Sequence, residues 1–154
     1  MMKNKKPEIG HYIDIGNCKV NYLDEGEGDV ILLLHGSGPG VTVYANWRLL
    51  IPVLSKDFRV IAPDVIGFGY TDFPESFDAT LTNWTDFLIR FMDSLGITKA
   101  SFVGKSFGGG LSLAMAVKHP ERVHRFVMMG AEGRKIDITE GLRKGWGYKR
   151  YFEA

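Results

Sequence analysis

Ser106 lies between Gly104 and Gly108, so residues 104–108 read Gly-Lys-Ser-Phe-Gly directly after an apolar stretch. This G-x-S-x-G spacing is the pattern of a nucleophile elbow, in which a strand turns sharply into a helix. The turn brings backbone against backbone, which requires small residues two positions before and after the serine. It exposes the hydroxyl to a base, and the next backbone N–H, that of Phe107, lies at a helix N-terminus where it can hold a developing oxyanion. The spacing therefore predicts nucleophilic catalysis by Ser106.

A second glycine-rich run, His-Gly-Ser-Gly-Pro-Gly, covers residues 35–40 and follows the first apolar stretch of the chain. Backbone N–H groups in such a turn can point into a crevice and bind an anion. One interpretation is a phosphate cradle, but the run lacks both the Lys-Ser/Thr ending of a P-loop and the spacing of a dinucleotide turn. The other is the second half of an oxyanion hole, the loop that accompanies a nucleophile elbow. Each motif alone is weak, and their occurrence together favours the oxyanion hole.

A third run, residues 63–72, contains Asp64 and closes another apolar stretch. We interpret Asp64 as a structural residue whose carboxylate accepts hydrogen bonds from the backbone of a tight loop. The alternative, an acid that orients a catalytic histidine, conflicts with chain order. Asp64 precedes Ser106, whereas an elbow of this kind is followed by its acid and then its histidine.

A serine needs a base to remove its proton, and the sequence offers no good partner for Ser106. His119 and His124 are the only histidines that follow Ser106. His119 ends the predicted helix that begins at the elbow, roughly 18 Å away at 1.5 Å per residue. His124 begins the next predicted strand, at the end remote from the elbow. We interpret both as surface or cap residues. Glu132 and Asp137 are candidates for the acid, with a solvated loop as the simpler interpretation.

The elements that must position these residues follow a regular alternation. Continuous apolar runs predict buried strands, and segments with helical spacing lie between them. Strand and helix in succession indicate a mostly parallel sheet with helices on both faces. Two segments around Gly16 and Asn17 predict an antiparallel hairpin at one edge, and a sheet that ends at its fourth parallel strand would leave an apolar edge. The expected strands are 11–15, 18–23, 30–34, 60–62, 101–103 and 126–129, and the expected helices are 46–54, 82–95 and 106–118.

Composition excludes several classes of function. The 154 residues are 45% apolar and 24% charged with a net charge of +1, which is ordinary globular composition and gives no electrostatic case for nucleic acid or an acidic membrane. Cys18 is the only cysteine, so an internal disulfide and a cysteine-rich zinc site are impossible. No apolar signal core or run of about 18 apolar residues is present. We therefore expect a cytoplasmic protein without a membrane span.

Three stretches resemble a known family: HGSGPGVTVYANWRLLIPVLSKDFRVIAPDVIGFGYTDFP, VGKSFGGGLSLAMAVKHPERVHRFVMMGA and DITEGLRKGWGY. The sequence resembles α/β-hydrolases. More narrowly, it is similar to the meta-cleavage product hydrolases, which cleave carbon–carbon bonds in aromatic catabolism, and within them it is closest to 2-hydroxymuconic semialdehyde hydrolases. The similarity extends from about Pro7 to Tyr148 and covers about the first half of a typical member. It implies the N-terminal part of an α/β-hydrolase core over residues 1–133 and the start of a lid over residues 134–154.

The resemblance also implies roles for single residues. Ser106 would be the nucleophile, and the backbone N–H groups of Phe107 and Ser37 would form the oxyanion hole. Lys105 stands where members of this subfamily usually have Asn, so it brings charge and length next to the nucleophile. The alternative is that Lys105 points away from the site. The residues that would bind substrate are Gly38, Asn46 and Lys105.

By the same resemblance, the full enzyme would hydrolyse a carbon–carbon bond in a 2-hydroxy-6-oxo-hexadienoate, a small-molecule substrate. The dienol would first become a ketone, and Ser106, with an acid and a histidine from outside this chain, would support attack at the 6-oxo carbonyl. A 2-hydroxypentadienoate and a small acid would result. No metal or organic cofactor is implied, and the full-length protein is expected to be a homo-oligomer. The alternatives are an esterase or amidase of the same fold, and a catalytically inactive fragment or binding module.

Overall fold

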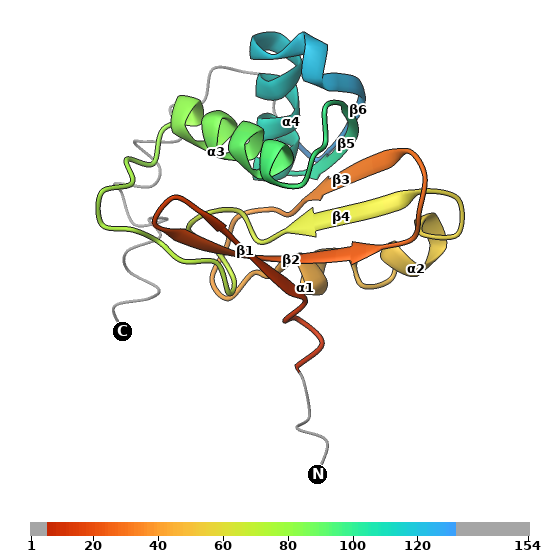
Figure 1. The fold of residues 1–154 in the computed structure, drawn as a ribbon, viewed down its shortest axis with the longest axis horizontal. Helices are drawn as coiled ribbons and strands as arrows, with labels where there is room; N and C mark the ends of the chain where they lie inside the picture. The colour runs from red at the N-terminus through yellow and green to blue at the C-terminus, as the bar shows by residue number, and fades with distance from the viewer. Residues whose placement is uncertain (1–5, 132–154) are drawn as a thin grey trace.

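A computed structural model describes residues 6–131 of the chain, and within them six strands form one sheet (Figure 1). Their order across the sheet is β1-β2-β4-β3-β5-β6. The strands are β1 His11–Ile15, β2 Cys18–Glu25, β3 Val30–Leu34, β4 Arg59–Pro63, β5 Ala100–Lys105 and β6 Val123–Met129. The helices are α1 Val43–Trp47, α2 Ile51–Leu54, α3 Leu81–Ser94 and α4 Phe107–Lys118, followed by the single 3₁₀ turn η1 Pro120–Arg122.

The hairpin predicted around Gly16 is confirmed as an antiparallel pair of β1 and β2 at one edge of the sheet. Gly16 has φ of +63°, the left-handed conformation that a tight two-residue turn requires. β2 is also antiparallel to β4, whereas β4, β3, β5 and β6 are parallel to one another. The predicted fold class, a mostly parallel sheet with an antiparallel N-terminal pair, is therefore confirmed.

Helices cover both faces of the sheet, as the apolar strands predict. α3 and α4 lie on one face, and α1 and α2 lie on the other (Figure 1). β3 shows how one strand serves both layers: Leu32 and Leu34 belong to the apolar cluster beneath α3 and α4, whereas Leu33 belongs to the cluster beneath α1 and α2. Because successive side chains of a strand alternate between faces, the fully apolar sequence of β3 is what a centrally buried strand needs.

α3 agrees closely with its prediction. The hydroxyl of Thr80 accepts a hydrogen bond from the Asn83 N–H at 3.2 Å and caps the first turn. Its apolar face packs on the sheet, and the helix ends before Gly96, whose φ of +68° would interrupt a right-handed helix.

The single helix predicted over residues 46–54 is wrong, because the structure has two short helices there, α1 and α2. Pro52 explains the interruption. In one continuous helix its ring would collide with the Arg48 carbonyl and leave that carbonyl without its N–H partner. The chain instead turns after Arg48 and starts again with Pro52 in the first turn of α2, where a missing N–H has no consequence.

The expectation that every parallel strand is covered on both faces is wrong for β6. Within the described residues β6 is an edge strand, and Phe126, Val127 and Met129 are 41%, 53% and 47% exposed. The apolar edge expected at the end of the sheet is therefore present. The predicted boundary at residue 133, the lid residues 134–154 and the acid candidates Glu132 and Asp137 lie outside the described residues.

Candidate active site

Ser106 occupies a strained turn between β5 and α4. Its φ and ψ are +51° and −116°, and it is the only residue other than glycine with positive φ among those described. Such backbone costs about 1–3 kcal/mol and persists only where the surroundings enforce it. Here the Ser106 N–H donates to the Met129 carbonyl of β6 at 2.8 Å, and its carbonyl accepts from Gly110 at 3.1 Å. Ser106 itself is exposed, so the turn presents its hydroxyl to solvent as the elbow pattern predicts.

The glycines on either side of Ser106 are required by close packing, as predicted. A Cβ on Gly104 would overlap the backbone of Gly108, where α4 folds back over the end of β5. A Cβ on Gly108 would overlap the Leu34 carbonyl oxygen and lie 2.6 Å from the His35 carbonyl oxygen. The elbow therefore packs directly on the end of β3, from which the glycine-rich run begins.

This packing brings the glycine-rich run of residues 35–40 to Ser106. A Cβ built on Gly36 would lie 3.6 Å from the Ser106 Cβ and 3.8 Å from the Asn46 Oδ1. The Gly36 N–H donates to that Oδ1 at 3.2 Å, which fixes the amide of Asn46 beside the turn. Ser37 and Gly38 follow, the first exposed and the second half-buried. The structure thus brings Asn46 and the start of the glycine-rich run to the elbow.

Phe107 and Lys105 flank Ser106 in different ways. The Phe107 ring is buried against Trp84 and Phe68, with ring centroids 4.8 Å and 5.6 Å away. Its N–H belongs to the first turn of α4, where backbone N–H groups have no acceptor within the helix and the helix dipole is positive. Lys105 is exposed at the end of β5. The positive end of α4 and the charge of Lys105 both favour a negatively charged group beside Ser106.

Asp64 is a structural residue, as interpreted from the sequence. Its side chain is fully buried and accepts three hydrogen bonds, from the Val43 N–H at 2.6 Å, the Tyr70 N–H at 2.9 Å and the Asn21 Nδ2 at 2.9 Å. A Cβ on Gly69 would overlap the carboxylate. Asn21 is a buried residue that the sequence reasoning missed, although an amide within the apolar strand CKVNYL was a usable signal.

His35 connects the glycine-rich run to the Asp64 turn. Its Nδ1 lies 2.7 Å from the Gly36 carbonyl oxygen, and its Nε2 accepts a hydrogen bond from the Val65 N–H at 2.9 Å. Since Nε2 is an acceptor, the proton resides on Nδ1 in the neutral ring. Burial lowers the pKa of His35, against the opposing influence of the Gly36 hydrogen bond and of Asp64. With both nitrogens engaged, His35 is a loop residue rather than a base.

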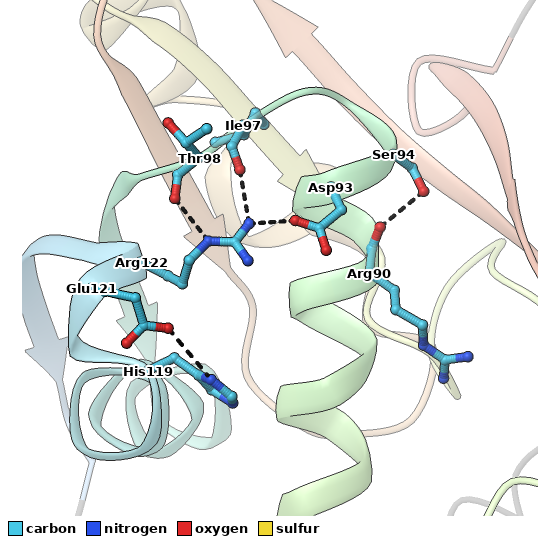
Figure 2. A network of polar contacts seen from close by, with 8 residues as sticks. All are labelled: Arg90, Asp93, Ser94, Ile97, Thr98, His119, Glu121 and Arg122. Carbon is cyan, nitrogen blue, oxygen red and sulfur yellow. Dashed lines mark hydrogen bonds and ion pairs between the residues drawn. The ribbon is translucent and has the colours of Figure 1, made fainter.

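The other described histidines also lie apart from the elbow, as predicted. His119 follows the last residue of α4, and its Nδ1 is 3.8 Å from Glu121 (Figure 2). The neighbouring Arg122 donates to Asp93 at 2.6 Å and to the Thr98 carbonyl at 2.7 Å, so this network joins the end of α4 to the end of α3. His124 is exposed near the start of β6, and His11 is in the hairpin. Residues 6–131 therefore supply no histidine base to Ser106.

A cavity of about 300 Å³ lies elsewhere, between the β1–β2 turn and α3, with Asn17, Asp78 and Arg90 among its lining residues. We place the candidate site at Ser106 instead, because the exposed serine, Asn46 and the start of the glycine-rich run lie together there. Burial raises the pKa of the Cys18 thiol, at the edge of this cavity, to about 11, so it is no competing nucleophile. Over the described range, no three His, Cys, Asp or Glu side chains gather as a metal site, and no helix is long and apolar enough to cross a membrane.

The strand order, the sharp turn at Ser106 and the adjoining glycine-rich run together are features of the α/β-hydrolase fold. The model of the α/β hydrolase fold family matches residues 29–154, and the chain belongs to this family. Similar proteins indicate a smaller group within this family. A 2-hydroxymuconate semialdehyde hydrolase of Pseudomonas sp. strain CF600 is 49% identical over 146 residues, which are 95% of this chain and 52% of that protein. A 2-hydroxy-6-oxo-2,4-heptadienoate hydrolase of Pseudomonas putida is 45% identical over 148 residues, or 96% and 54% of the two chains.

The solved structures that resemble this chain include members of the same group of hydrolases. A meta-cleavage product hydrolase from Pseudomonas fluorescens IP01 is 50% identical, with a TM-score of 0.83 over 96% of this chain and 57% of that one. These relatives are hydrolases of meta-cleavage products, and the resemblance expected from the sequence is confirmed. The chain spans about half the length of the curated relatives it matches.

Proposed function

We propose that this chain forms the nucleophile-bearing part of a hydrolase that cleaves a carbon–carbon bond in 2-hydroxy-6-oxo-hexadienoates, with 2-hydroxymuconic semialdehyde as the type of substrate. The observation that carries the proposal is the convergence at Ser106. The Cβ of the strained Ser106 and the Oδ1 of Asn46 lie 3.6 Å and 3.8 Å from the position that a Cβ on Gly36 would take, and Gly36 directly precedes Ser37. Relatives at 45–49% identity act on such compounds, which supports the substrate class.

In this proposal the oxyanion of the attacked 6-oxo group accepts hydrogen bonds from the Phe107 and Ser37 N–H groups. Gly38, Asn46 and Lys105 bind the dienoate end of the substrate. Ser106 gives up its proton to a histidine, oriented by an acid, that comes from outside residues 6–131. The N–H groups and the α4 dipole would thus stabilise negative charge as it develops, while Ser106 assists attack on the carbonyl.

The test is the loss of the yellow dienolate absorbance of 2-hydroxymuconic semialdehyde, followed with the full-length product of this reading frame. We expect cleavage by the wild-type protein, and a loss of at least about a thousandfold in kcat for Ser106→Ala. Ser112→Ala is the matched control, since the Ser112 hydroxyl is buried in α4 and bonds only the Gly108 carbonyl. Turnover of p-nitrophenyl acetate without loss of the dienolate would instead favour an esterase. Failure of a fluorophosphonate to label Ser106 would indicate an inactive protein.

We further propose that the enzyme acts in the cytoplasm as a homo-oligomer. The single, buried and unpaired Cys18 supports a reducing compartment. Size-exclusion chromatography with light scattering on the full-length product would test the oligomeric state, and a monomer would contradict it.

A further inference from the structure

Lys105 points to a property of the site that the proposed function leaves open. It is the last residue of β5, directly before Ser106. Side chains alternate along a strand, and Gly104 faces α4, since a Cβ there would overlap Gly108. Lys105 therefore belongs to the opposite face of the sheet. That face is shared with Val103, which packs on the apolar cluster that contains Trp47 of α1.

This face is also where Asn46 lies, on the helix α1 that ends at Trp47. Gly36 is the shared neighbour. A Cβ on Gly36 would be 3.6 Å from the Lys105 carbonyl oxygen, 3.6 Å from the Ser106 Cβ and 3.8 Å from the Asn46 Oδ1. Lys105 and Asn46 thus flank the serine and the first glycine of the run from two elements, β5 and α1.

The described part of the chain does not neutralise the charge of Lys105. No carboxylate among residues 6–131 forms an ion pair with it. The buried Asp64, near the start of α1, is already occupied by three donors. The start of α4 adds positive potential at the same place. Within residues 6–131, an anion beside Ser106 would therefore find the charge of Lys105 unpaired, with no acidic side chain bonded to it.

We propose that Lys105 determines the charge selectivity of the site, by pairing its ammonium group with the carboxylate of a dienoate substrate. The inference rests on the proposed function, since it assigns the dienoate end of that substrate to Lys105. A lysine offers a mobile full charge where an amide offers only a neutral hydrogen bond, so binding should depend on the charge of the ligand and on ionic strength.

The test measures binding and needs no turnover. Sorbate, a straight-chain dienoate, and its neutral amide sorbamide are titrated into the full-length product of the reading frame by calorimetry. We expect wild-type protein to bind sorbate about tenfold more tightly than sorbamide at low salt, and salt to reduce the difference. Lys105→Gln should abolish the preference, and Lys105→Arg should retain most of it. Lys99→Gln is the matched control, because Lys99 is an exposed lysine just before the opposite end of β5.

The proposal is wrong if Lys105→Gln binds sorbate as tightly as wild type, or if the wild-type protein binds sorbate no better than sorbamide, including the case in which it binds neither. The dienolate assay separates this outcome from a failure of the proposed function. Cleavage of the dienoate without charge preference rejects only the role of Lys105. A charge preference that depends on Lys105 without cleavage rejects only the proposed reaction.

Discussion

Two turns follow the carboxyl ends of β4 and β5, the strands on either side of β3, and they differ in how their polar groups are satisfied. In the turn after β4, Asp64 is fully buried and its carboxylate is occupied by hydrogen bonds from Val43, Tyr70 and Asn21. In the turn after β5, Ser106 is exposed, has strained backbone and has an N–H neighbour at a helix N-terminus. The first turn satisfies its carboxylate internally, whereas the second satisfies the Ser106 backbone but leaves the Ser106 side chain exposed.

The availability of polar groups distinguishes a turn that stabilises the fold from a turn that could bind a substrate. A buried polar group whose partners all belong to the protein lowers the free energy of the fold and has nothing left for a substrate. An exposed serine on a strained backbone costs stability and is held in place by its neighbours. His35 joins the first turn through Val65, and Gly36, the next residue, packs against the second. The glycine-rich run therefore connects the two turns: His35 bonds the turn that contains Asp64, and Gly36 packs against the turn that contains Ser106.

The strongest test of this comparison is Asp64→Ala. It removes the acceptor of three hydrogen bonds. The buried Val43 N–H and the half-buried Tyr70 N–H lose their partner and the Asn21 Nδ2 keeps only the Glu8 carbonyl, so we expect a loss of about 4 kcal/mol in the free energy of unfolding. Urea unfolding of the full-length product, followed by tryptophan fluorescence, measures it. Asp57→Ala, at an exposed aspartate, should change stability by less than about 0.5 kcal/mol. Equal effects of the two substitutions would contradict a structural role for Asp64.

A second test compares two glycines of α4. The methyl group of Gly108→Ala would collide with the carbonyl oxygens of Leu34 and His35, which are backbone atoms with little room to move, so we expect a loss of about 3 kcal/mol. Gly110→Ala adds its methyl in open space and should stabilise the helix by about 1 kcal/mol. The same unfolding experiment gives both values. A change of the same sign for the two variants would show that α4 does not depend on close approach to β3.

The sequence predicted the parts of the fold in which local pattern and tertiary structure agree. The apolar run of β3, the helical spacing of α3 and the turn at Gly16 each have one stable solution, and each was predicted close to its observed bounds. The elbow could be predicted because Gly104 and Gly108 are needed for steric reasons that the spacing reveals. These signals depend on residues close together in the sequence, and so they can be recognised from the sequence alone.

The features that were missed depend on contacts between distant segments or on a competing local rule. The break between α1 and α2 follows from Pro52, whose effect was underestimated beside the apolar spacing of residues 46–54. The exposure of β6 could not be predicted from its own apolar sequence, because exposure depends on what packs beside the strand. Asn21 was missed since its partners, Asp64 and the Glu8 carbonyl, are 43 and 13 residues away.

The prediction with the smallest expected effect tests the backbone strain at Ser106 directly. Ser106→Gly removes the side chain that disfavours φ of +51°, so the variant should be about 1 kcal/mol more stable than wild type. Ser106→Ala also removes the hydroxyl but keeps the Cβ, and its stability should stay near that of wild type. Both should lose labelling by a fluorophosphonate, which makes alanine the control that separates backbone strain from the loss of the nucleophile. If the two variants were equally stable, the turn would not store strain, and the contrast with the Asp64 turn would reduce to exposure alone.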